Sequence, residues 1–526
     1  MNVRNLRKAA ALLLAILMLV MLTACGTKDN TGNSGPDTTQ SQDTGEKSTA
    51  VAVGTTNPYY AFNPNGSNQP AVFCRLLVFD TLFAMGADTE YYSPIAADWG
   101  WDDATTLRIT LKNNITFSNG SQMTGEDVMA SFQYARDCGS QMASFWEGVI
   151  DFDLSYVSED GMTVYLVYTK PYGPALSELS SLVIMDDEFM AEHPADDEIW
   201  WSAPVGSGPY EITETMTDSY VVYTLRENYW DDSRTHDCTE ITVRHYTDST
   251  AMMTDYQNGV IDAAFGLDSI QVDSFENGQT AGHLVKNSLY SVPTMVMNEN
   301  NEYLKDIEVR RAIAYAVNWA AVGEMAWGSL QTAADSHWPA ATAYHVSHEG
   351  YTYDPEKAVQ ILTDAGYDPA EMSFYYIAVS SNAQEMRVME AVQGYLGDIG
   401  ITVECASYEL NTALPYYFAG ENDLAVLNST NGLNDVWTIY SATYNGLFAD
   451  RSLSDPEYRA LLEEGLDTVD PEARAEAYRK LDGWLYENYW FMPYCEIQEA
   501  WCYNDRIASL EMVSSNFGSL GDIKLA

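Results

Sequence analysis

The residue types best suited to metal chemistry are His345 and His348, with Glu349 directly after them. Two imidazoles three residues apart can hold one metal ion when both lie on the same face of a helix. Gly350 and the aromatic residues around this pair favour a loop, which does not impose that spacing. We therefore predict neither a metal site nor a cofactor.

Ser207, between Gly206 and Gly208, is the residue that could be mistaken for a nucleophile. A nucleophile elbow needs serine two residues after the first glycine, whereas Ser207 follows Gly206 directly. The sequence contains no H-E-x-x-H motif, and its many carboxylates form pairs by chance. We predict a protein that is not an enzyme. The alternative is an extracellular hydrolase of peptides or sugars, which turnover by the pure protein would reveal.

Cysteines and acidic residues do not indicate a site either. None of the six cysteines after Cys25 lies at C-x-x-C spacing, which argues against a zinc site and a dithiol motif, and we expect free thiols. The acidic stretch 186–198 lacks the alternate-position spacing of an EF-hand loop, so a solvated surface is the better interpretation.

The chain has a net charge of −50, and removal of a signal with three basic residues would bring this to about −53. Such a charge repels phosphates, which argues against nucleic-acid binding.

Residues 1–24 have the composition of a secretory signal, with a basic start and an apolar run from Ala9 to Leu22. Leu22-Thr23-Ala24-Cys25 resembles the lipobox of bacterial lipoproteins, which implies that Cys25 becomes the acylated first residue of the mature chain. Several acyl chains would then hold the protein on the outer face of the membrane. Residues 25–50 are expected to form a disordered tether, because they contain almost no apolar residues.

Strand and helix patterns alternate along the body of the chain. Leu107–Leu111 alternates as a half-buried strand, and Thr124 with Asp127 predicts a capped helix that runs to about Cys138. In the second half, Asp354-Pro355 starts a helix that Gly366 ends, and Ile313, Val317 and Ala320 are expected on one face of another. These patterns indicate an α/β protein.

Two glycines, Gly206 and Gly208, are expected to supply backbone angles that other residues avoid. Their segment is one of several blocks that resemble the extracellular solute-binding proteins of family 5, the oligopeptide, dipeptide and nickel-binding components of ABC importers. In chain order the blocks are 117–120, 124–128, 206–210, 226–230, 258–262, 306–313, 353–358 and 365–367.

The resemblance implies a large two-lobed fold of the periplasmic-binding-protein type II, with an extra inserted domain. Lobe I would comprise residues 51–90, 201–295 and 490–526, the inserted domain residues 91–200, and lobe II residues 296–489. The lobes would close over a ligand by hinge bending. The implied partners are ABC permease and ATPase subunits, and a monomer is expected.

The family's peptide binders commonly pair an aspartate with the α-amine of the peptide. Ser429 and Gly432 occupy the corresponding Trp-x-x-Asp places here, which leaves Asp435 as the substitute and puts a free peptide N-terminus in doubt. The ligand class therefore stays open between oligopeptides and other small solutes, such as an oligosaccharide or a nickel complex. The predicted ligand-binding residues are Asn428, Asn431, Asn434, Asp435, Trp437, Tyr416 and Tyr417.

Overall fold

The structure is a computed structural model, and the residues that it describes all lie from residue 48 onward. They are residues 48–56, 64–65, 72–86, 88–140, 143–427, 435–437, 440, 454–512 and 518–526. The predicted signal, Cys25 and almost all of the predicted tether lie outside this range.

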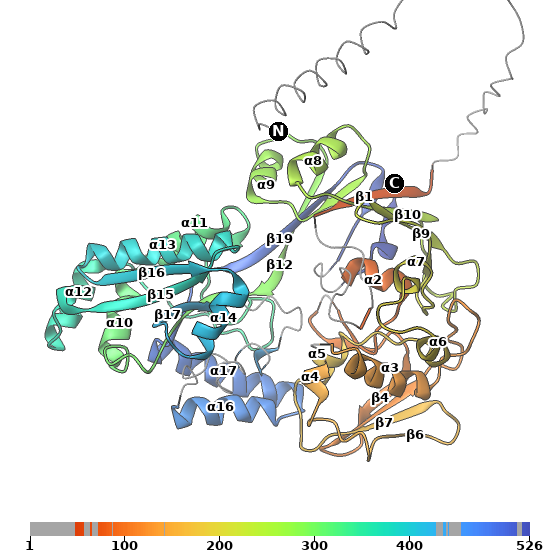
Figure 1. Cartoon of the computed structure of the whole chain (residues 1–526), viewed down its shortest axis with the longest axis horizontal. Helices are drawn as coiled ribbons and strands as arrows, with labels where there is room; N and C mark the ends of the chain where they lie inside the picture. The colour runs from red at the N-terminus through yellow and green to blue at the C-terminus, as the bar shows by residue number, and fades with distance from the viewer. Residues whose placement is uncertain are drawn as a thin grey trace, which may run out of the picture. The chain divides into compact units, whose positions relative to one another are not determined.

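The first sheet collects strands from distant parts of the chain (Figure 1). Its strands, in order across the sheet, are β12 (His283–Ser291), β19 (Glu496–Tyr503), β11 (Ala263–Phe265), β1 (Ala50–Thr55), β10 (Glu240–His245), β9 (Tyr220–Leu225) and β8 (Tyr210–Met216), and β14 (Gln331–Thr332) pairs with β19. Strand β1 is parallel to both β10 and β11, a pairing that needs long connections. The sheet is therefore complete only when the start, middle and end of the chain have come together.

The second sheet is antiparallel and lies within a single stretch of sequence. It has the order β4 (Ala96–Trp101), β5 (Thr106–Leu111), β7 (Thr163–Val167) and β6 (Tyr156–Val157). The predicted alternation in β5 is confirmed, because Leu107, Ile109 and Leu111 are buried between more exposed residues. The capping box of Thr124 and Asp127 is also confirmed, and it starts α3 (Gly125–Asp137).

The third sheet is mixed and carries helices of the second half of the chain (Figure 1). Its strands are β16 (Thr402–Tyr408), β15 (Ser373–Val379), β17 (Leu424–Leu427), β13 (Thr294–Met297) and β18 (Phe491–Pro493). The helices of this part are α10 (Ile307–Ala316), α11 (Trp319–Trp327), α12 (Pro355–Asp364), α13 (Ala383–Asp398), α14 (Leu410–Phe418), α16 (Pro456–Leu466) and α17 (Pro471–Asn488). Helix α12 starts at the predicted Asp354-Pro355 cap and ends before Gly366, as expected.

Shorter elements complete the described chain. They are α2 (Val72–Val78), β2 (Ala84–Met85), β3 (Tyr91–Tyr92), α4 (Ala143–Trp146), α5 (Ala175–Leu179), α6 (Asp187–Glu192), α7 (Ile199–Ser202), α8 (Ser249–Gln257), α9 (Ser269–Glu276), η2 (Pro369–Glu371), β20 (Ile507–Ser509), η3 (Leu520–Asp522) and β21 (Lys524–Leu525). None of the helices in the described residues combines the length and apolar character that crossing a bilayer requires.

One predicted helix is two helices. The prediction that Ile313, Val317 and Ala320 lie on one face of a single helix is wrong for the last two residues. Helix α10 stops at Ala316, and the backbone of Val317 is extended. The side chain of Asn318 then accepts a hydrogen bond from the backbone N–H of Ala321 and caps α11, which leaves Ala320 exposed on the second helix. A local side-chain cap therefore overrides the helical periodicity.

The glycines of the 206–210 block are needed for close approach, and not for unusual backbone angles as the sequence suggested. Neither has a positive φ, but a Cβ on Gly206 would lie 2.0 Å from the carbonyl oxygen of Val78. The buried guanidinium of Arg226 donates to the carbonyl oxygens of Gly206, Gly208 and Phe117, at 3.2, 2.9 and 3.0 Å. Three of the sequence blocks thus meet at one structural junction between the first two sheets.

Strand pairing also bears on the predicted domain boundaries, which stay a prediction. The third sheet takes β13 from residue 294 and β18 from residues 491–493, slightly beyond the predicted limits of 296 and 489. On pairing alone, the second lobe would extend by two residues at its start and four at its end.

Candidate functional site

A cavity is lined by residues of the first sheet, the second sheet and helix α17. Its empty volume is about 1010 Å³, including the space open to solvent at its mouth. It is lined by Met85, Thr89, Glu90, Tyr91, Trp99, Trp101, Gly173, Leu176, Ser177, Tyr290, Thr342, Ala343, Tyr344, Asp435, Val469, Pro471, Arg474 and Ala475. A concave site with aromatic walls and a few polar groups is the usual form of a small-molecule site.

Asp435 and Arg474 form the charged end of this cavity. The two carboxylate oxygens of Asp435 lie 2.9 and 2.7 Å from Nη2 of Arg474, and Oδ1 also accepts a hydrogen bond from the backbone N–H of Trp437. Burial disfavours the charged form of Arg474, but the carboxylate of Asp435 outweighs it and raises the arginine pKa. The pair is therefore a fixed ion pair, and its acid is 2% exposed.

Arg474 is held by other groups as well. Its Nε donates to the carbonyl oxygen of Gly465 at 2.9 Å, and Nη2 donates to the hydroxyl of Tyr478 at 3.0 Å. Its Nη1 has no hydrogen-bond partner among the described residues, although the side chain lines the cavity and is 14% exposed.

The loop before α5 connects the second sheet to the helices beside the third sheet. The backbone N–H of Gly173 donates to the carbonyl oxygen of Leu466 at 2.7 Å, and Lys170 pairs with Asp467 at 2.8 Å. A Cβ on Gly173 would lie 2.3 Å from Nε of Arg474 and 2.5 Å from the carbonyl oxygen of Thr468. Only glycine permits this approach at the edge of the cavity.

Glu178 is a buried carboxyl group close to this edge. It is 2% exposed and accepts a hydrogen bond from the hydroxyl of Tyr172 at 2.6 Å. Burial raises the pKa of Glu178 well above its ordinary value.

The predicted ligand-binding residues are only partly brought together. Asp435 lines the cavity, and Trp437 follows it with its ring against the apolar cores of the second and third sheets. Asn428, Asn431 and Asn434 lie outside the described residues, as does Cys25.

Tyr416 and Tyr417 do not line this cavity. Tyr416 stacks on Tyr408 with ring centroids 4.9 Å apart, and Tyr417 is buried with its hydroxyl donating to the carbonyl oxygen of Ile377. Their role in ligand binding stays a prediction.

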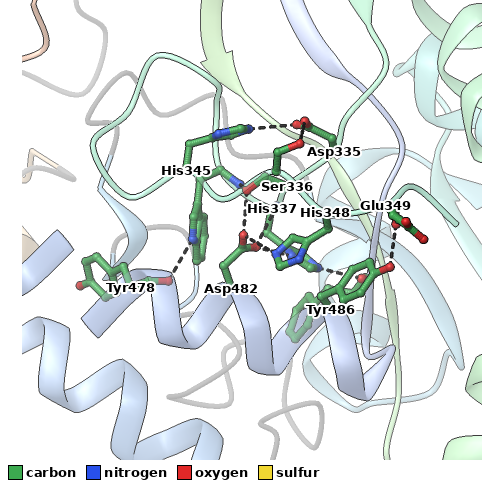
Figure 2. A network of polar contacts seen from close by, with 12 residues as sticks. Asp335, Ser336, His337, His345, His348, Glu349, Tyr478, Asp482 and Tyr486 are labelled. Atoms are coloured by element: carbon green, nitrogen blue, oxygen red, sulfur yellow. Dashed lines mark hydrogen bonds and ion pairs between the residues drawn. The ribbon is translucent and has the colours of Figure 1, made fainter. Parts of the chain in front are cut away.

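The histidines that suggested a metal site belong to a polar network (Figure 2). His345 lies 2.9 Å from Asp335, and Nε2 of His348 lies 2.9 Å from Oδ2 of Asp482. Asp482, on α17, is also bonded by Ser336 and by both the backbone N–H and Nδ1 of His337. The described residues contain no group of three or more histidine, cysteine, aspartate or glutamate side chains arranged to hold a metal ion.

The network also positions a wall of the cavity. Next to His337, the Trp338 indole donates to the carbonyl oxygen of Tyr478 and packs edge to face against Tyr344, which lines the cavity.

Sequence reasoning missed Asp482, Arg474 and these aromatic residues. The motif Trp99-Gly100-Trp101 was the one visible signal of an aromatic surface here.

Two other hollows are weaker candidates. One, of about 890 Å³, lies beside α2 and includes Asp80, Arg234 and Asp522, and the other lies along α3 within the second sheet's own domain. The walls of the cavity at Asp435 and Arg474 combine residues of β12 in the first sheet, β4 in the second sheet and helix α17.

Comparison with known proteins gives a family match and a set of relatives. Residues 90–448 match the model of bacterial extracellular solute-binding proteins, family 5. The chain is 24% identical over 511 residues to heme-binding protein A of Haemophilus influenzae, covering 90% of each chain. It is 25% identical over 383 residues to the nickel-binding periplasmic protein of Escherichia coli, covering 68% of this chain and 70% of that one.

A Brucella ovis protein named as an ABC transporter peptide-binding protein is 24% identical over 295 residues. The chain spans about half the length of this relative, with 54% of each covered.

Solved structures show the same fold. HbpA2 of Haemophilus parasuis superposes with a TM-score of 0.80 at 18% identity, covering 91% of this chain and all of the other. NikA of Brucella suis, in complex with Fe(III)-EDTA, gives a TM-score of 0.77 at 18% identity with the same coverage. The predicted two-lobed α/β periplasmic-binding fold is therefore confirmed.

Proposed function

Because this chain belongs to the bacterial extracellular solute-binding proteins of family 5, we propose that it captures a small solute in the cavity at Asp435 and Arg474. The family supplies the coarse role: a solute-binding protein of an ABC importer, extracellular or periplasmic, that works with permease components. The observation that supports the cavity as the site is its set of walls, which come from residues far apart in the sequence: 85, 89–91, 99, 101, 173, 176–177, 290, 342–344, 435, 469, 471 and 474–475. A ligand that contacts all these segments would stabilise the closed form.

The proposed ligand is an oligopeptide. Support comes from the aromatic walls, which accept varied apolar groups, and from the Brucella relative named for peptide binding. Some relatives are named for heme binding and nickel binding, so the test also includes small ligands other than peptides.

The test uses the purified mature body. A thermal-shift screen covers di- to hexapeptides, oligosaccharides and nickel complexes, and each hit is followed by X-ray scattering and by mass spectrometry of the recovered solute. Ligand at 100 times its Kd should add about 2.7 kcal/mol to the stability of the folded state. Binding that compacts the protein and returns the solute unchanged supports the proposal, whereas cleavage of the solute would establish the alternative, a hydrolase.

Variants locate the site. Trp101→Ala and Tyr344→Ala each remove an aromatic wall and are expected to weaken binding by tenfold or more, since burial of an aromatic ring contributes about 1.5–3 kcal/mol. Tyr156→Ala is the matched control, because Tyr156 is 53% exposed and lies on β6, outside the cavity lining.

We also propose that Cys25 carries the acyl anchor, that residues 25–50 form the tether and that the protein acts as a monomer. The support is the basic start, apolar run and cysteine at lipoprotein spacing. Expression of Cys25→Ser in a bacterial host should release the protein from the membrane fraction, while Cys138→Ser should leave it there. Membrane retention of Cys25→Ser would contradict the anchor.

A further inference from the structure

The charged end of the cavity selects against one common ligand group. Of the described residues that line the cavity, those with charged side chains are Glu90, Asp435 and Arg474. Both oxygens of Asp435 are already bonded to Arg474, and the residue is 2% exposed. A ligand ammonium could use only the remaining lone pair of Oδ2, which accepts a single hydrogen bond among the described residues, and the burial of Asp435 restricts access to it. The described walls therefore offer an incoming ammonium no unpaired buried carboxylate, and the remaining acid of the lining, Glu90, is exposed to solvent.

The same end of the cavity offers a donor. A guanidinium has five N–H groups, and Arg474 uses Nε and Nη2 on Gly465, Asp435 and Tyr478. Nη1 has no partner among the described residues, and the Arg474 side chain lines the cavity and is 14% exposed. An acceptor from a ligand, or a water molecule in its absence, would complete its hydrogen bonding.

The charge balance decides which acceptor fits best. The charge of Arg474 is already matched by Asp435, and Glu90 adds a negative charge at the wall. A carboxylate would bring a further negative charge into this end without a free cation to meet it. A neutral carbonyl oxygen satisfies Nη1 without that cost.

We propose that Nη1 of Arg474 donates a hydrogen bond to an amide carbonyl oxygen of the ligand, next to an apolar group held by the aromatic walls. The cavity thus selects ligands by an amide acceptor and not by a free ammonium group. This inference rests on the proposed function, since it names the ligand class of that same site.

The arrangement is held in place by the segments around it. The guanidinium lies over Tyr478, with its carbon 4.9 Å from the ring centroid, and Gly173 approaches Nε so closely that a Cβ there would clash with it. Arg474 is therefore prepositioned, so a ligand amide does not have to order it.

The experiment compares two forms of one peptide mixture. A tryptic digest of casein, and the same digest acetylated with acetic anhydride, are each incubated with the purified protein, and retained peptides are quantified by mass spectrometry after desalting. Acetylation removes ammonium groups and keeps every backbone amide. We expect the acetylated digest to be retained within twofold of the untreated one.

Three variants test the donor. Arg474→Gln paired with Asp435→Asn removes both charges together, so no charge is left buried and unpaired, and it should lower retention of both digests tenfold or more. Arg474→Lys keeps the charge but loses the planar fork, and it should lower retention by a smaller factor. Arg136→Gln, on α3 and 51% exposed at its side chain, should leave retention unchanged.

The outcomes separate the inference from the proposed function. Retention of the untreated digest more than tenfold above the acetylated one would overturn the inference, as would unchanged retention in the double variant, which would mean that Nη1 holds only water. If neither digest is retained but another solute binds and compacts the protein, the inference fails and the proposed function stands. If no solute of any class binds, the proposed function itself fails.

Discussion

Replacement of Asp482 by asparagine should break a buried polar network in the second half of the described chain. The carboxylate accepts four hydrogen bonds: from Ser336 Oγ, from the backbone N–H and Nδ1 of His337, and from Nε2 of His348. Its side chain is fully buried. Asparagine has nearly the same shape, but it has one carbonyl oxygen, and its amide group would face two of the donors.

The expected loss is large because a buried charge partner disappears. Breaking a buried pair by removing one member costs about 3–5 kcal/mol. Both ring nitrogens of His337 face acceptors, Asp482 Oδ1 at 2.6 Å and the carbonyl oxygen of Phe491 at 3.1 Å. In Asp482→Asn, the amide nitrogen would take the place of one carboxylate oxygen and could not accept from the groups that now bond to it.

The loss should also depend on pH. Burial disfavours the Asp482 carboxylate, but hydrogen bonds from His337 and His348 outweigh it and lower the pKa of Asp482 far below its usual range. A lowered native pKa means that the stabilisation is complete above the unfolded value of about 4 and is lost as pH falls through the native one. The difference between wild type and Asp482→Asn should therefore be greatest at pH 7 and shrink below about pH 4.

Urea denaturation followed by tryptophan fluorescence measures the difference, with Trp338 next to the network as a reporter. Asp505→Asn is the matched control, since the Asp505 side chain is 95% exposed, and its effect should stay within about 0.5 kcal/mol. A loss below about 1 kcal/mol, or an equal loss at pH 7 and pH 3, would refute the role given to Asp482.

Three other changes test different parts of the structure. Gly173→Ala places a Cβ 2.3 Å from Nε of Arg474, so it should weaken solute binding at least tenfold by calorimetry, whereas Gly394→Ala, with nothing within 4 Å, should not. Glu178→Gln should leave the melting temperature at pH 7 equal or higher. The raised pKa of Glu178 gives the wild type a stability that is full below about pH 4 and declines as pH rises toward the native pKa, so the variant should show a flatter profile. An unchanged slope would argue against a raised pKa of Glu178. Ile109→Ala on β5 should cost about 2–5 kcal/mol because Ile109 is fully buried, and a loss under 1 kcal/mol would contradict that packing.

The sequence by itself determined the local elements and the family. Alternation in β5, the Thr124–Asp127 capping box and the Asp354-Pro355 start of α12 were all read correctly, because each depends on residues within a few positions of one another. Periodicity failed where the cap of Asn318 divided one expected helix into two. The sequence blocks identified the family, and several of them hold the fold together, as the bonds of Arg226 to two blocks show.

Only the tertiary structure decided which side chains form the candidate site. Asp435 and Arg474 are 39 residues apart, and His337 and Asp482 are 145 apart, so no local pattern connects either pair. Asp435 was expected as a ligand acid, but the structure engages both its oxygens with Arg474. The spacing of apolar residues predicts which face of a helix or strand is buried. The partner of a charged group depends on which distant elements pack against it, and that information is not in the local sequence.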